Sequence, residues 1–153
     1  ACAAAKKLAA DSKGMLHSAE HLYYEALIRA GHAGRGTLRE RRAVARAGAK
    51  LSAWARHCPA NFAHKAELVR AESLRLAGDT AQALSAHARA AELASEFGYA
   101  NVEGLAHLLA ARLHAECGQT AGADAALERA RASFRRWGAN ALAAAPDLLQ
   151  RQR

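Results

Sequence analysis

Residues that oppose a helical fold are scarce in this chain of 153 residues. It holds only two prolines, and aromatic residues make up 5% of it, so neither a proline-rich extended chain nor an aromatic-rich core is expected. Valine, isoleucine and threonine, which favour strands, are also few. Alanine dominates, followed by leucine, glutamate and arginine, all of which favour helix. The composition predicts an all-α fold in which helices approach one another closely.

Cysteine is sparse as well. Cys2, Cys58 and Cys117 are an odd number at wide spacing and form no C-x-x-C pair, which argues against a disulfide framework and a zinc motif. We expect reduced thiols in a cytoplasmic protein. No apolar run reaches the roughly 20 residues of a membrane span, and no signal peptide is recognisable. The chain begins in an alanine-rich stretch without an initiating methionine, so we expect a segment of a larger protein.

Acidic residues are outnumbered, and the formal net charge is +8. Such a balance can indicate nucleic-acid binding or an acidic membrane surface. The one dense basic cluster comprises Arg35, Arg39, Arg41, Arg42 and Arg46. No groove-reading motif accompanies it, which argues against nucleic acid as a partner. We interpret the cluster as a solvated helix face, with contact to an acidic partner or a phosphate as the alternative.

Glycines and polar turns divide the chain at regular intervals. Breaks lie at 31–36, at Cys58-Pro59, and at Gly78, Gly98, Gly118 and Gly138. The helices predicted between them are about 13–30, 38–57, 60–77, 80–97, 100–116 and 120–137. A short terminal helix is expected within 140–150, where Pro146 disrupts its continuity.

The breaks recur with a period of 40 residues. Gly78 and Gly118 are 40 residues apart, as are Gly98 and Gly138. The same shift aligns Asn61 with Asn101, Leu68 with Leu108, Ala71 with Ala111, Ala83 with Ala123, Ala90 with Ala130 and Phe97 with Trp137. A period of about 20–50 residues indicates stacked supersecondary units.

Each unit is a helix, a short turn and a second helix, with small residues where the paired helices cross. This pattern is typical of tetratricopeptide repeats, although their usual period is about 34 residues. We therefore predict a right-handed α–α superhelix of three antiparallel helix pairs, forming one domain over residues 1–153. The pairs are 13–57, which is divergent, 60–98 and 100–138, followed by a tail or short helix over 139–153.

Three segments resemble parts of large bacterial signalling ATPases. The stretch WARHCPANFAHK, from Trp54 to Lys65, is similar to their WA-x-x-CP-x-NF-x-HK segment. The stretch ARASFRRWGA, residues 130–139, is similar to A-R-x-x-Y-x-x-WGA, and HLYYEAL, residues 21–27, to H-x-x-x-FY-x-x-L. A lysine often follows the WGA in these proteins, and Asn140-Ala141-Leu142-Ala143 lacks it.

The resemblance implies a place for this chain within a larger architecture. Such proteins join a serine/threonine-kinase-like domain, a STAND-class nucleotide-binding module, a helical repeat and, in some, a GAF sensor with a histidine kinase. It implies that this chain is the helical repeat alone. No Walker A loop, Gly-rich kinase loop or phosphoacceptor histidine box is present in it.

Two patterns suggest chemistry, and both have a simpler interpretation. Residues 17–21, HSAEH, fit the H-x-x-E-H motif of inverted zinc peptidases, but no third carboxylate ligand is evident. Cys58 lies beside His57, but adjacent helix residues face different directions and no third orienting group is apparent. We predict that this chain is not an enzyme and needs no metal or cofactor.

Histidines and aromatic residues are expected mainly between helices. His87 and His114 fall where tetratricopeptide units pack a tyrosine. Several aromatic residues sit near helix ends and are predicted to fill seams between pairs, with an exposed anchor for a partner as the alternative. They are Trp54, Phe62, Phe97, Tyr99, Phe134 and Trp137.

The first helices of successive pairs line a concave groove in solenoids, and this groove is their usual binding surface. The turn positions place ten side chains there: Lys65, Leu68, Glu72, Arg75, Leu76, Leu105, Leu108, Arg112, Ala115 and Glu116. Charges of both signs over leucines suit an amphipathic helix, a peptide or a neighbouring domain.

These features predict a non-catalytic regulatory segment of a bacterial signalling protein that acts as a scaffold or relay. Its partner is expected to be another protein, a neighbouring domain of the same polypeptide, or a second copy in a homodimer. The alternative is a ligand-sensing segment of a transcription regulator that binds a small molecule in the groove.

Overall fold

The structure, a computed structural model, describes residues 16–32 and 37–145, which contain helices and turns and no strand. The all-α prediction is therefore confirmed for this part of the chain. The helices are α2 (Leu16–His32), α3 (Leu38–Ala55), α4 (Pro59–Ala77), α5 (Thr80–Glu96), α6 (Ala100–Glu116), α7 (Thr120–Trp137) and α8 (Asn140–Ala143). Residues 13–15 and 146–150 of the predicted helices lie outside the described ranges. No helix within those ranges is long and apolar enough to cross a bilayer.

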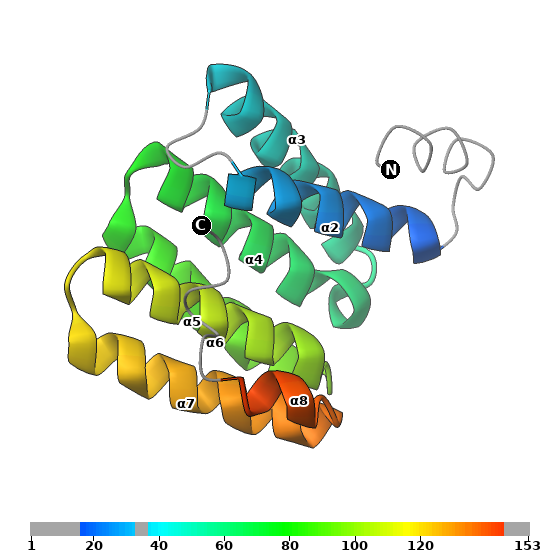
Figure 1. Ribbon diagram of the computed structural model, residues 1–153. Helices are drawn as coiled ribbons and strands as arrows, with labels where there is room; N and C mark the ends of the chain where they lie inside the picture. The colour runs from blue at the N-terminus through cyan, green and yellow to red at the C-terminus, as the bar shows by residue number, and fades with distance from the viewer. Residues whose placement is uncertain (1–15, 33–36, 146–153) are drawn as a thin grey trace.

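The helices pack as consecutive pairs, α2 with α3, α4 with α5 and α6 with α7, and each pair contacts the next. Figure 1 shows them stacked in chain order, from α2 and α3 at one end to α7 and α8 at the other. This arrangement agrees with the predicted antiparallel pairs. The right-handed superhelical winding stays a prediction.

Four turns share one backbone form. Gly78, Gly98, Gly118 and Gly138 all have positive φ, between 71° and 89°, and follow one another at 20-residue steps. At the first of these turns, the N–H of Gly78 donates to the carbonyl of Arg75 and that of Asp79 to the carbonyl of Leu74. Glycine adopts this left-handed conformation without the cost that a Cβ brings, so each glycine ends its helix sharply.

Small side chains fill the crossings between paired helices. The six alanines that the 40-residue shift aligns are all buried: Ala71, Ala83, Ala90, Ala111, Ala123 and Ala130. Gly104 of α6 lies against the Phe134 ring of α7 so closely that a Cβ on Gly104 would come within 2.6 Å of it. The alanine-rich composition thus has a packing consequence, since these positions allow close helix approach.

Leucines join successive pairs. Leu68 of α4 is buried in one apolar cluster with Val102 of α6. Forty residues later, Leu108 of α6 packs in a second cluster that includes Ala143 and Leu142 of α8. The short helix α8 therefore covers the end of α6 much as α6 covers α4.

Candidate functional site

Helix α2 lies over the part of α4 that was expected to line an open groove. Lys65, Leu68, Glu72 and Leu76 of α4 are all buried. Leu108 is buried as well, because it packs toward α7 and α8. These five side chains therefore line no open groove here, which corrects their predicted placement. The physical reason is that α2 and α8 cover them.

The other predicted residues reach the surface to different degrees. Arg75, Leu105 and Arg112 are partly exposed, while Ala115 and Glu116 are exposed. They lie toward the second halves of α4 and α6, where α2 ends. Their contact with a partner stays a prediction.

Polar contacts fix α2 along α4 at both ends. The Lys65 ammonium group is paired with the Glu20 carboxylate. One Arg75 Nη donates to the Ala30 carbonyl oxygen over 2.8 Å. Both contacts join residues 45 positions apart, so α2 and α4 run parallel with a constant offset.

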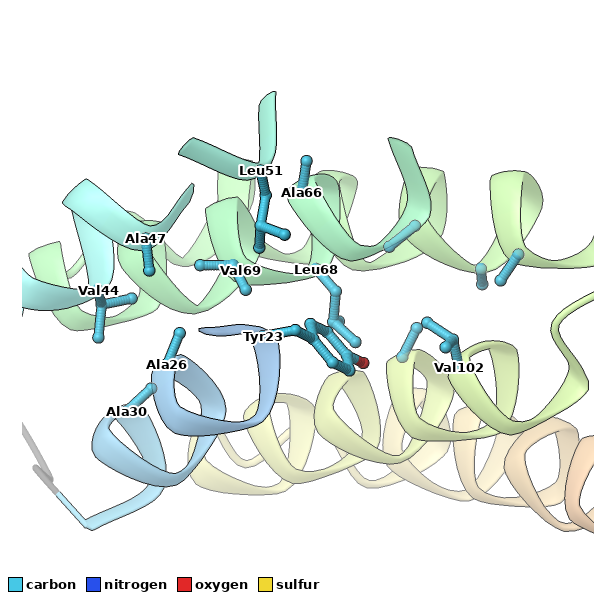
Figure 2. Packing of buried hydrophobic residues seen from close by; sticks show 14 of the residues in the cluster. Tyr23, Ala26, Ala30, Val44, Ala47, Leu51, Ala66, Leu68, Val69 and Val102 are labelled. Carbon is cyan, nitrogen blue, oxygen red and sulfur yellow. The ribbon is translucent and has the colours of Figure 1, made fainter. Parts of the chain in front are cut away.

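An aromatic side chain fills the space between these contacts. Tyr23 of α2 is fully buried, and Figure 2 shows its ring directed between Leu68 of α4 and Val102 of α6. Burial raises the pKa of its hydroxyl well above the ordinary value. Among the described residues the Tyr23 hydroxyl has no hydrogen-bond partner, so the ring acts through apolar packing.

The start of α6 is fixed by a cluster around Tyr99. The His64 ring stacks on the Tyr99 ring with centroids 4.2 Å apart, and the Lys65 Nζ lies 5.2 Å from the same ring centroid. The Tyr99 hydroxyl donates to the Asn61 side-chain oxygen over 3.2 Å. Burial, with the positive charge of Lys65, lowers the pKa of His64 to about 4, so His64 is neutral at pH 7.

A buried carboxylate lies further along α4. Burial alone would raise the pKa of Glu72, but His87 and Arg75 outweigh that effect and hold it below its ordinary value. The Arg75 Nη is 2.9 Å from one Glu72 oxygen, and the His87 Nε2 is 3.3 Å from the other. Glu72 is therefore an ionised structural anchor that ties α4 to α5.

Only a small hollow remains where the ends of α2, α4 and α6 meet. It measures about 60 Å³ and includes Gly31, Glu72, Arg112 and Glu116 in its lining. Pockets for small organic ligands usually measure about 300–1,000 Å³. This hollow can hold water or a small ion, but not a metabolite-sized ligand.

The exposed side of α2 carries two large apolar residues one turn apart. Tyr24 is 45% exposed and Ile28 is 49% exposed. A side-chain hydrogen bond joins Tyr24 to Asn101 of α6. Because α2 and α6 continue side by side, Ile28 lies at about the level of Leu105, one turn along each helix. The α2/α6 face consists of Tyr24, Ile28, Leu105, Leu109, Arg112 and Glu116.

Sequence reasoning missed this face because it compared the pairs at one shift only. A shift of 40 residues gives a weak match for the first pair, whereas the contacts of α2 with α4 join residues 45 apart. A shift of 45 would have placed Tyr23 beside Leu68 and Ala26 beside Ala71. That offset was the available signal for α2.

The residues considered for chemistry lie apart from one another. His21 Nε2 is 3.7 Å from a Glu25 oxygen, and the described part of the chain holds no group of three His, Cys, Asp or Glu side chains arranged to bind a metal. Cys58 is half-buried at the start of α4 and Cys117 is exposed. Cys2 lies outside the described residues.

The packing predictions for histidines and aromatic residues are mixed in outcome. His87 is buried between α4 and α5 against Glu72, as a packing role requires. Trp54 meets Phe62 with ring centroids 5.7 Å apart, which fills the seam between α3 and α4. Trp137 is 55% exposed and fills no seam.

Comparison with known proteins identifies no relative. No protein-family model and no curated protein matches the sequence, and no solved structure matches the fold.

Proposed function

We propose that this chain is a non-catalytic, tetratricopeptide-like module that binds a protein partner through the α2/α6 face, in a cytoplasmic signalling protein of the STAND-ATPase kind. The observation that carries the proposal is the exposed pair Tyr24 and Ile28. Single exposed apolar residues are ordinary on a protein surface. Two of them one turn apart, beside Leu105 and Leu109 of the next helix, form a continuous strip suited to a partner.

The polar residues at the end of this strip give it direction. Arg112 and Glu116 follow Leu105 and Leu109 on α6, and all four border α2 or its end. An amphipathic helix lying along the strip would meet Tyr24 and Ile28 first and a charged pair last. A neighbouring domain or a second copy of the chain can supply such a helix, as can a separate protein.

A small-molecule sensor has less support. The hollow beneath the expected groove measures about 60 Å³, well below the usual size of a ligand pocket. The side chains around it are largely committed to one another, as the contacts of Glu72 with Arg75 and His87 illustrate.

Site-specific photocrosslinking tests the proposal. A benzophenone amino acid replaces Ile28 on the α2/α6 face and, as a matched control, Ala125, an exposed residue of α7. After irradiation in cells that make the parent protein, we expect a discrete adduct from position 28 that mass spectrometry identifies as one protein sequence. Tyr24→Glu should reduce that adduct by at least about tenfold. Equal adduct patterns from positions 28 and 125 would refute the α2/α6 face.

A further inference from the structure

A second groove lies between α2 and α3, on the side of α2 away from Tyr24 and Ile28. It measures about 370 Å³, and its apolar lining consists of Leu22, Ala26, Ala43 and Ala47. At about 100° per residue, Leu22 and Ala26 face nearly opposite to Tyr24 and Ile28 around α2. The groove is therefore independent of the α2/α6 face, and a partner bound in it would add to the proposed function.

Basic side chains border this groove along α3. Arg39, Arg46 and Lys50 line it and are exposed. They occupy positions i, i+7 and i+11, so they form one stripe about 16 Å long. In the described part of the chain none of the three has an acidic partner, although the Lys50 Nζ lies 5.0 Å from the Trp54 ring centroid.

The acidic residue in the groove does not neutralise this stripe. Glu25 lines the groove but lies 2.8 Å from an Arg29 Nη. The other Arg29 Nη is 3.0 Å from Glu40 of α3. These three residues form a closed ionic bridge between α2 and α3. The charges of Arg39, Arg46 and Lys50 are left to face whatever enters the groove.

We propose that this groove binds an amphipathic helix of another protein, with small apolar residues on its inner face and acidic residues along the flank that meets α3. The alanines of the floor allow a helix to approach closely, as alanines do elsewhere in this chain. The basic stripe extends over about three helical turns, which matches the length of a short docking helix.

Two other occupants fit the surface less well. A second copy stacked end to end would present α7, whose Arg129, Arg135 and Arg136 are exposed and repel the stripe. Nucleic acid would leave the apolar floor without a matching group, because no aromatic side chain lines the groove for base stacking. The acidic helix satisfies both the floor and the border.

Fluorescence anisotropy with designed probes tests this proposal. The probe is a labelled 18-residue helical peptide with an Ala/Leu stripe flanked by glutamates. A second probe carries glutamine at every glutamate position, and a 20-base-pair DNA duplex serves as a plain polyanion. We expect the glutamate peptide to bind at least about tenfold more tightly than the glutamine peptide. Arg39→Glu/Arg46→Glu should remove this preference, and Ala43→Trp, which fills the floor, should abolish peptide binding.

Control variants separate the groove from net charge and from the other face. Arg89→Glu/Arg135→Glu changes the net charge equally on α5 and α7 and should leave the peptide Kd within about twofold. Ile28→Glu should also leave it unchanged, so failure of the proposed function is distinguishable. Circular dichroism checks that each variant is folded. Absent peptide binding, equal loss in the control variant, equal binding of both peptides, or tighter binding of DNA than of the glutamate peptide would each overturn the proposal.

Discussion

The first helix pair and the two pairs after it are held together differently. Helices α4 to α7 meet through buried alanines and end at four glycines of one conformation. Helix α2 instead depends on one large ring, Tyr23, and on polar contacts to Lys65 and Arg75 at either end. Close alanine packing distributes stability over many positions, whereas α2 concentrates it at one.

The two regions also differ in what they expose. Four large apolar side chains of the described residues are exposed, and three of them, Tyr24, Ile28 and Leu38, belong to the first pair. The later pairs therefore supply the rigid framework, while the first pair supplies both candidate surfaces.

The most damaging test of this contrast is Tyr23→Ala. Removing a fully buried aromatic ring costs about 3–5 kcal/mol, and urea unfolding measures the loss. Hydrogen exchange should then quicken along α2 more than along α6 and α7. Tyr23→Phe is the matched control and should be as stable as the original, because the hydroxyl has no hydrogen-bond partner among the described residues. Uniform acceleration of exchange in all helices would refute the special dependence of α2.

Acid should weaken the second pair before the third. The pKa of His64 is lowered to about 4, while the unfolded chain binds this proton near pH 6.5. The unfolded state therefore takes up a proton first, and stability present at pH 7 is lost as pH falls from about 6.5 to 4, by up to about 1.4 kcal/mol per pH unit. His64→Phe keeps a stacked ring and should flatten this part of the stability–pH curve. An unchanged slope would contradict the prediction.

The third pair solves the same position with the opposite sizes. Forty residues after His64 and Ala94 stand Gly104 and Phe134. A Cβ on Gly104 would lie 2.6 Å from the Phe134 ring, so Gly104→Ala should cost about 1–3 kcal/mol through overpacking. In thermal unfolding, Gly104→Ala/Phe134→Leu should cost less than the sum of the two single changes. Simple additivity would show that the two residues do not compete for space.

Turn glycines and helix glycines should respond with opposite signs. Gly78 ends α4 with φ of +89°, so Gly78→Ala should cost about 1–2 kcal/mol. Gly48 lies within α3, where a Cβ would meet Val69 at 3.4 Å, and Gly48→Ala should gain about 0.5–1 kcal/mol. Chemical unfolding measures both, and a gain at Gly78 would contradict the account of the turns.

Much of the framework was predictable from local signals. The predicted helices 100–116 and 120–137 match α6 and α7 at both ends, because a glycine ends each one within a helix-favouring sequence. The predicted helix 38–57 is two residues too long. Its last turn tightens, since the Trp54 carbonyl accepts from the N–H groups of both His57 and Cys58.

The candidate site could not be predicted in the same way. Whether Lys65 and Glu72 face solvent depends on where α2 packs, and α2 reaches α4 through contacts 45 residues apart. Local periodicity carries no information about that long-range register. The position of Leu108 depends likewise on α8, a helix of only four residues.

The seating of α2 on α4 and α6 is the claim on which both proposed surfaces depend. Nuclear Overhauser effects between the Tyr23 ring protons and methyl groups measure it directly in the isotopically labelled chain. We predict strong cross-peaks from Tyr23 to the methyl groups of Leu68 and of Val102. A Tyr23 ring with cross-peaks to neither residue would contradict the account and return the groove over α4 to solvent.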